Sequence, residues 1–414
     1  MSFFSTPLSG LSATSAALKT ISNNLANMNT DGYKAQSASF SDVFYQNYGN
    51  SGSGNPIQSG LGVQVNGTTS DLSNGAISAT GVSSNMALNG SGYFVTSGAP
   101  GALNYTRSGD FTTNTAGQLT TLGGQLVMGF PAVRGVVSGS GTLQALNVGA
   151  GTTTAASPTS AFSLTANLNS GAAVNDTQSS QVKIYDSLGA SHLLSINYTK
   201  TGNNTWSYNA TMPSSEIQGG TGTSTSVGSG TLTFDSTGAL TSPTNAISSI
   251  SIGPMSDGAA TLSPTWKLVD GSGTALLTQT ASAASTSATT QDGYAAGTLA
   301  SFSVLADGTV QATFTNNQNR AIGQVAVASF ANPEGLSLSG DNLYNVTSAS
   351  GAAVVGVAGT GGRGVIKGSA VEGSNVDVAT EFADMIVAQR SYEANAKAIT
   401  AFDQIEQATI AMKS

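Results

Sequence analysis

The sequence of 414 residues lacks cysteine altogether and contains one histidine, His192. Disulfides, thiolate metal sites and a cysteine nucleophile are therefore excluded, and a metal site built on a pair of histidines cannot form. The absence of cysteine also suits an exported chain that does not depend on the redox state of a compartment.

Charged residues are scarce as well. They make up 8% of the chain, whereas an ordinary soluble domain carries roughly 25%. The 13 basic and 21 acidic side chains leave a net charge of −8, so the chain lacks the basic surface that binds nucleic acid by releasing counterions. We expect no nucleic-acid partner.

Long apolar segments are also missing. The most apolar stretch, around residues 352–358, is interrupted by glycine and is far shorter than the roughly 18 to 20 residues that span a bilayer. Residues 1–7 show neither the basic nor the apolar region of a cleaved secretory signal. We therefore expect no membrane insertion, and we expect any export to proceed without a cleaved signal peptide.

Groups for catalysis are few. His192 lies in a strand-like stretch without a legible arrangement of serine and aspartate, so we interpret it as structural. Acidic residues are scattered singly, mostly beside glycine in turns, where aspartate hydrogen-bonds the backbone. The segment Gly90-Ser91-Gly92 is an incomplete dinucleotide fingerprint. We predict a protein that is not an enzyme, with no catalytic, cofactor-binding or metal-ligating residue.

The N-terminal end has the pattern of a helix. Thr6 can cap it, and Pro7 suits its first position because the missing N–H would be unpaired there anyway. Apolar side chains follow at alternating steps of three and four, which is the seam of a heptad repeat. The positions are Leu11, Thr14, Leu18, Ile21, Leu25 and Met28, of which all but Thr14 are predicted subunit contacts.

The C-terminal end predicts a second, longer helix. Ser374 and Asp377 have capping-box spacing, and no glycine or proline interrupts residues 378–412. Two terminal heptads would bury their seams against each other and against neighbouring copies of the chain. The predicted subunit-contact residues on this helix are Phe382, Met385, Ile386, Tyr392, Ile399, Phe402 and Ile405.

Between the helices, apolar residues alternate with period two. Residues 302–306 and 310–314 flank Asp307-Gly308, a strong hairpin signal, and residues 182–184 and 194–198 flank another turn. Low-complexity segments at 149–160 and 281–290 suggest linkers. We predict a mainly β protein whose terminal α-helices pair in a coiled-coil-like inner layer, followed by nested antiparallel β domains. The expected parts are 1–34 with 372–414 (helical), 35–148 with 291–371 (first β domain) and 149–290 (inserted outer β domain).

Several motifs resemble the family of bacterial flagellar rod and hook axial proteins. The N-terminal signature includes Leu8-Ser9-Gly10-Leu11, residues 23–27 and Thr30-Asp31-Gly32-Tyr33-Lys34. Residues 88–95 with 105–111 resemble the segment that rod and hook proteins share, and residues 372–377 with 389–395 resemble the C-terminal signature. The family-motif positions are Asn23, Asn24, Asn27, Thr30, Gly32, Tyr33, Gly90, Gly92, Arg107, Gly109, Phe111, Arg390 and Tyr392.

The middle of the chain favours the hook members of that family. Residues 185–189, 234–238 and 322–336 are similar to hook-specific segments, and rod proteins are generally shorter and lack the inserted domain. The resemblance implies an extracellular structural subunit that polymerises into a flexible hollow tube, a universal joint that passes torque from rod to filament. Implied partners are other copies of the chain, a rod subunit, the hook cap, the hook–filament junction protein and the flagellar export apparatus.

Other functions remain open from the sequence. A distal rod subunit, a rigid drive shaft, is the nearest alternative. A secreted adhesin would share the Ser/Thr/Gly-rich β composition, but should show a signal or an anchor. An enzyme that processes glycans would need two carboxylates brought together from distant segments.

Overall fold

The computed structural model describes residues 5–50, 52, 56–99, 101–149 and 151–413. Residues 1–4 of the expected helical part and residue 150 of the expected first linker lie outside the described residues. The chain forms two compact units. Unit 1 comprises Met1–Ala150, Ser301–Thr313 and Asn319–Ser414, and unit 2 comprises Gly151–Ala300 and Phe314–Gln318.

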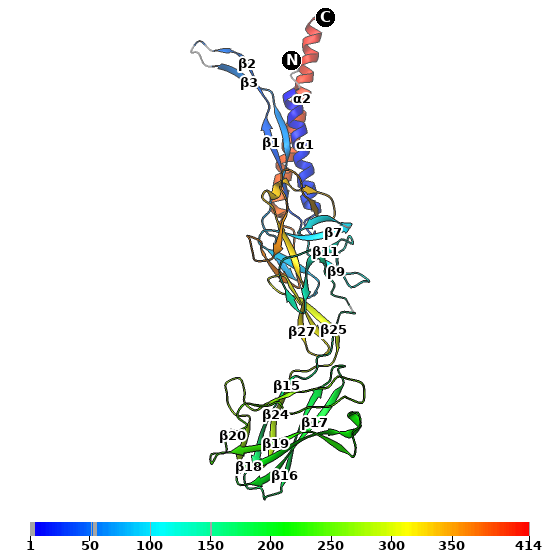
Figure 1. Ribbon diagram of the computed structural model, residues 1–414. Coiled ribbons are helices and arrows are strands. Elements are labelled where there is room, and N and C mark those ends of the chain that lie inside the picture. The colour runs from blue at the N-terminus through cyan, green and yellow to red at the C-terminus, as the bar shows by residue number, and fades with distance from the viewer. Residues whose placement is uncertain (1–4, 51, 53–55, 100, 150, 414) are drawn as a thin grey trace. The chain divides into compact units, whose positions relative to one another are not determined.

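Two helices form one end of unit 1 (Figure 1). They are α1 (Ser5–Ala26) and α2 (Val378–Lys413). They run antiparallel, because Gly10 of α1 lies against Asn395, whereas Asn24 contacts Glu381 near the start of α2. With 36 residues against 22, α2 extends past the first described residue of α1. The prediction of paired terminal helices within a mainly β protein is confirmed.

The two helix starts differ in detail from the prediction. Thr6 already lies inside α1, so the expectation that it caps the helix was wrong; Pro7 still falls in the first turn, where the missing N–H costs no hydrogen bond. At α2 the cap is Asp377, whose Oδ1 accepts from the N–H groups of Ala379 (2.8 Å) and Thr380 (3.0 Å). The predicted capping box, with Ser374 as the cap, was therefore shifted by three residues.

Two small hairpins follow α1. β1 (Gln36–Asp42) pairs with β4 (Val63–Ser70), and β2 (Tyr45–Asn50) pairs with β3 (Pro56–Gly60). Both β1 and β4 contact α1. Two further pairs join strands that precede the large sheet in the sequence to strands that follow it. They are β5 (Ile77–Ala79) with β32 (Ala370–Glu372) and β6 (Met86–Asn89) with β31 (Val365–Gly368).

The large sheet has the strand order β14-β25-β26-β27-β11-β7-β8-β29-β28. Its bounds are β14 (Thr153–Thr154), β25 (Gly297–Val304), β26 (Thr309–Phe314), β27 (Asn319–Ser329), β11 (Leu126–Val133), β7 (Tyr93–Ala99), β8 (Ala102–Thr106), β29 (Leu343–Asn345) and β28 (Ser337–Leu338). Short strands at its sides are β9 (Phe111–Thr113), β10 (Leu119–Thr121), β12 (Val136–Val137), β13 (Gln144–Ala145) and β30 (Val354–Val357), and η2 (Pro333–Gly335) is a 3₁₀ turn. The predicted hairpin at Asp307-Gly308 is confirmed, since it joins β25 to β26.

Unit 2 is built from two five-stranded sheets. One has the order β16-β17-β18-β19-β20, and in the other β22 lies between β21 and β15, with β23 and β24 also beside β15. The bounds are β15 (Ala161–Asn169), β16 (Thr177–Tyr185), β17 (Ser191–Gly202), β18 (Thr205–Pro213), η1 (Ser214–Glu216), β19 (Ser224–Phe234), β20 (Leu240–Ser242), β21 (Ala246–Ile247), β22 (Thr265–Lys267), β23 (Leu277–Thr280) and β24 (Ser285–Gln291).

Alternation of buried and exposed residues along the strands builds the core of unit 2. In β15 every second side chain is buried, from Phe162 to Leu168. Trp206 and Trp266 are fully buried in the hydrophobic core of unit 2. The predicted linker at 281–290 was wrong, because most of it forms β24, an exposed strand antiparallel to β15. Threonine, which occurs three times in β24, favours strands, so composition alone misled the prediction.

Candidate functional site

Small and polar side chains lie at the contact between α1 and α2. Ala13 and Ala388 are buried, and a Cβ added at Gly10 would lie 2.8 Å from Oδ1 of Asn395. Such residues let two helix backbones approach closely, so the pair needs few large apolar side chains for its own contact.

Five of the twelve apolar residues predicted to contact other subunits are exposed in the single chain. Ile405 is 61% exposed, Ile386 52% and Phe382 48%. Met28 and Tyr392 are also exposed. The remaining predicted positions are half-buried: Leu11, Leu18, Ile21, Leu25, Met385, Ile399 and Phe402.

A groove of about 550 Å³ runs beside the helix pair, between α1, α2 and the β1–β4 hairpin. Ala13 and Ala17 of α1, Phe40 of β1, and Val387 and Ala388 of α2 contribute to its mostly apolar wall. An exposed apolar wall of this kind costs free energy in water unless another surface covers it.

At the base of the helices lies a buried polar junction made by Lys34, Arg107 and Glu372. Lys34 follows α1, Glu372 ends β32 shortly before α2, and Arg107 follows β8. Lys34 Nζ lies 2.7 Å from Glu372 Oε1, and Arg107 Nη2 lies 3.0 Å from Glu372 Oε2. The three side chains are at most 4% exposed. The junction therefore ties both chain ends to the β part of unit 1.

The junction holds two positive charges against one negative charge, and backbone carbonyls stabilise the excess. Nη1 of Arg107 donates to the carbonyls of Gly90 (2.8 Å) and Gly92 (2.7 Å), and Nζ of Lys34 donates to Ser73 O (2.6 Å). Burial lowers the pKa of Lys34, and the hydrogen bond to Glu372 opposes this shift. The positive φ values of Gly90 (110°) and Gly92 (128°) explain why glycine occurs where these carbonyls turn toward Arg107.

Asn24 links α1, α2 and β1 at the same end of the helices. It is 1% exposed, and its Nδ2 donates to Gln36 O (2.7 Å) and to Glu381 Oε1 (2.8 Å). Its Oδ1 accepts from Gln36 N (2.9 Å) and from the hydroxyl of Tyr33 (3.1 Å). All four hydrogen-bonding positions of this amide are thus used.

The other family-motif residues shape the surroundings of this junction or lie apart from it. At the end of α1, Nδ2 of Asn27 donates to Asn23, and Nδ2 of Asn23 donates to the hydroxyl of Tyr33. The hydroxyl of Thr30 donates to Oδ1 of Asn27. Gly32 and Gly109 are sites of close backbone approach, because an added Cβ would lie 2.4 Å from Ser108 N at the first. Phe111 lies in the core against Phe94, whereas Arg390 is exposed on α2.

The role of Lys34 and Glu372 as one ion pair was missed by sequence reasoning, although both residues lie in motifs that it singled out. A chain with only 34 charged residues offers a signal here. A charge retained within an otherwise uncharged apolar segment, such as Glu372 after Ala370-Val371, indicates a buried and paired group.

No helix among the described residues is long and apolar enough to cross a membrane.

Four family models match the chain. "Flagella basal body rod protein" matches residues 4–34, and "Flagellar hook protein FlgE/F/G D1 domain" matches 87–164. "Flagellar basal body protein FlaE D2 domain" matches 152–294, and "Flagellar basal body rod FlgEFG protein C-terminal" matches 367–412. Together they follow the chain from one terminal helix to the other.

Curated relatives match over nearly the full length. The flagellar hook protein FlgE of Escherichia coli (strain K12) is 34% identical over 97% of this chain and 98% of its own. That of Rhizobium meliloti (strain 1021) is 32% identical over 99% and 98%. The crystal structure of Helicobacter pylori flagellar hook protein FlgE2 aligns with 70% of this chain and 99% of that one, at 13% identity and a TM-score of 0.49. The identities across whole chains show that this protein belongs to the flagellar hook protein family.

Proposed function

We propose that the protein polymerises through its terminal helices into the hollow, flexible tube of the bacterial flagellar hook, outside the cell. The observation that carries this proposal is the exposure of large apolar side chains on α2, with Ile405 at 61%, Ile386 at 52% and Phe382 at 48%. Within one chain the helices meet at Gly10 and Asn395 and at Asn24 and Glu381, so these exposed side chains are left for contacts with other copies.

In the assembled tube, the helix pair and the β part of unit 1 have different mechanical roles. Helices packed seam against seam with their neighbours form a stiff wall, and the buried junction of Lys34, Arg107 and Glu372 couples each helix pair to its β part. Torque applied to the helices therefore passes into the β part through buried ion pairs.

Bending during rotation requires outer contacts that exchange easily. A chain in which 8% of the residues are charged and many carry hydroxyl or amide groups forms weak, hydrated surface hydrogen bonds that replace one another at little net cost. Buried ion pairs between subunits would instead fix one register. The composition thus suits a universal joint.

The remaining assignments extend this proposal. The subunit acts without catalysis, and it passes through the flagellar export apparatus. It meets a rod subunit at the proximal end, and the hook cap and the hook–filament junction protein at the distal end. The distal-rod alternative is not favoured, because the relatives that match across the whole chain are named hook proteins.

A pair of matched variants tests the proposal. Ile386→Asp places a charge on the exposed α2 surface, and Val174→Asp places one at a 56% exposed position in unit 2. We expect Ile386→Asp to abolish tubes seen by electron microscopy while its β signal in circular dichroism is unchanged, and Val174→Asp to form tubes. Normal tubes from Ile386→Asp would overturn the proposed contact surface.

A further inference from the structure

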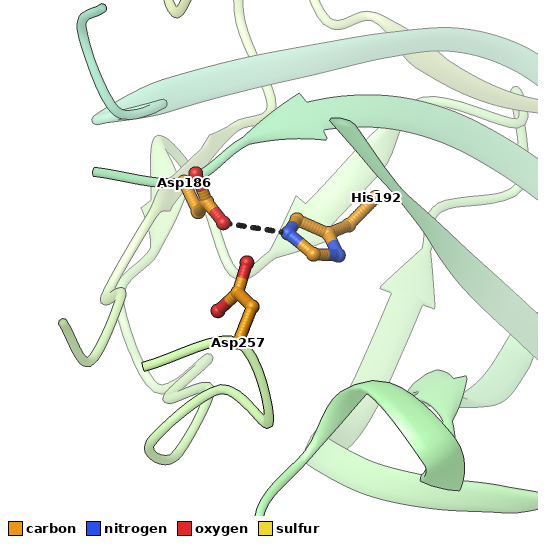
Figure 2. Close-up of side chains that lie close together, drawn as sticks. All are labelled: Asp186, His192 and Asp257. Carbon is orange, nitrogen blue, oxygen red and sulfur yellow. Dashed lines mark hydrogen bonds and ion pairs between the residues drawn. The ribbon is translucent and has the colours of Figure 1, made fainter. Parts of the chain in front are cut away.

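Three side chains that could hold a metal ion converge in unit 2 (Figure 2). Asp186 follows β16, His192 lies at the start of β17, and Asp257 lies in the loop between β21 and β22. One ligand atom of each lies within 4.8 Å of the other two. Asp186 is fully buried and His192 is 8% exposed, so two of the three groups are fixed inside the fold.

The turns orient both carboxylates in the same way. Oδ1 of Asp186 accepts from the N–H groups of Leu188 (2.9 Å) and Ala190 (2.8 Å), and Oδ1 of Asp257 accepts from Ala259 N (2.9 Å). One oxygen of each carboxylate is therefore used by its own turn. The second oxygen of Asp186 lies 3.0 Å from His192 Nε2, and Figure 2 shows an oxygen of Asp257 directed toward the same point.

Glu216 sets the orientation of the imidazole. Its Oε2 lies 2.7 Å from His192 Nδ1, which donates to it when Nδ1 carries the proton. The lone pair of Nε2 then faces Asp186 and Asp257. Metal-binding histidines share this arrangement, in which the second ring nitrogen donates to a carboxylate that fixes the ring.

The charge of the cluster favours a cation. Three carboxylates surround a single imidazole, so a negative charge remains even when His192 carries its proton. Among the described residues, the ion pairs of Asp186 and Glu216 are both made with this same histidine. A divalent ion between the two aspartates would lower their mutual repulsion and would take the place of the Nε2 proton.

We propose that Asp186, His192 and Asp257 bind a divalent transition-metal ion, best matched by Zn²⁺, with water completing the coordination. One imidazole and two carboxylate oxygens form a donor set that suits zinc, whereas Ca²⁺ and Mg²⁺ are bound by oxygen alone. The sequence analysis predicted no metal ligand, and this proposal departs from it. The bound ion fastens the loop of Asp257 to the turn between β16 and β17 and stabilises unit 2.

Zinc titration of the full-length, untagged chain after treatment with EDTA tests the site. Because His192 is the one histidine and cysteine is absent, the sequence offers zinc no other imidazole or thiolate. By calorimetry we expect one Zn²⁺ per chain and a higher thermal midpoint of unfolding. Co²⁺ should give the visible absorption of a site with a nitrogen ligand.

Asp257→Asn and Asp270→Asn form the matched pair. Both residues are aspartates in exposed turns of unit 2 that accept backbone N–H groups, and Asp270 does not belong to the cluster of Asp186, His192 and Asp257. We expect Asp257→Asn to weaken zinc binding by about 10-fold or more and to remove the rise in midpoint, and Glu216→Gln to weaken binding by about 10-fold. Asp270→Asn should bind zinc like the unchanged chain.

Three results would overturn the assignment. They are the absence of stoichiometric zinc binding, equal affinity in Asp257→Asn and the unchanged chain, and a rise in midpoint from CaCl₂ or MgCl₂ as large as that from ZnCl₂. The last result would show a hard-cation site that does not use His192. Each readout is independent of tube formation, so this test and the test of the proposed function fail separately.

Discussion

Nζ of Lys34 lies 2.7 Å from Oε1 of Glu372, although the two residues are 338 positions apart. One residue follows the first terminal helix and the other precedes the second. The ion pair is buried, and Arg107 binds the second oxygen of the same carboxylate. The two ends of the chain are thus joined at one point before they continue as the antiparallel pair of α1 and α2.

Removal of the charge at the junction should destabilise unit 1. Glu372→Gln leaves two buried cations without their carboxylate, and loss of one partner of a buried ion pair costs about 3 to 5 kcal/mol. Urea unfolding measures this loss. The control is Glu334→Gln, at an exposed glutamate of η2, for which we expect almost no change. Equal midpoints for both variants would contradict a structural role for the junction.

Asn24→Ala should loosen the helix pair. The substitution removes the partner of the N–H and C=O of Gln36 and the acceptor of the Tyr33 hydroxyl, at about 1 to 3 kcal/mol for a buried group left unpaired. Hydrogen exchange in α1 should become faster, whereas Asn29→Ala, at an exposed position, should leave it unchanged. Unchanged protection in Asn24→Ala would show that the helices hold together without this amide.

Gly109→Ala should disturb the β part of unit 1. An added Cβ would lie 1.5 Å from the carbonyl oxygen of Met86, a backbone atom that cannot rotate away. We expect a clear fall in the thermal midpoint. Gly271→Ala is the control, because its Cβ would meet open space. A stable Gly109→Ala chain would mean that this backbone contact relaxes at little cost.

The acid stability of unit 2 should depend on Asp292. Its burial raises the pKa of the carboxyl, but hydrogen bonds from Ser160 and from the N–H of Ala161 outweigh this and hold the pKa below 3.8. A lowered pKa in the folded state stabilises unit 2 above pH 3.8, and this contribution is lost as the pH falls through the lowered value.

Unfolding followed by circular dichroism between pH 5 and pH 2 measures this dependence. Asp292→Asn should reduce the steepness of the acid-induced loss of stability, while Asp384→Asn on α2 should leave unit 2 unaffected. The same acid profile for Asp292→Asn and the unchanged chain would assign the acid sensitivity to other carboxyl groups.

Local patterns in the sequence predicted several elements of the fold. The run without glycine or proline from residue 378 gave the extent of α2, and Asp307-Gly308 gave the hairpin of β25 and β26. These features depend on residues close in sequence, where backbone preferences decide the structure.

Contacts between distant segments were beyond such patterns. Heptad spacing predicted that large side chains such as Phe382 are buried in the helix seams, whereas in the single chain Ala13 and Ala388 are buried and Phe382 is 48% exposed. Asp186 and His192 are close in the chain, but Asp257 reaches them only through the packing of its loop. Tertiary packing, which local preference does not encode, determines both arrangements.

Cysteine labelling tests the central claim, that the exposed face of α2 contacts other copies, most directly. Because the chain has no cysteine, Ile386→Cys and Val174→Cys each introduce one thiol, at positions 52% and 56% exposed in the single chain. We expect maleimide to label both rapidly in the monomer, and to label Val174→Cys but not Ile386→Cys in assembled tubes. Equally rapid labelling of Ile386→Cys in monomer and tube would contradict the account.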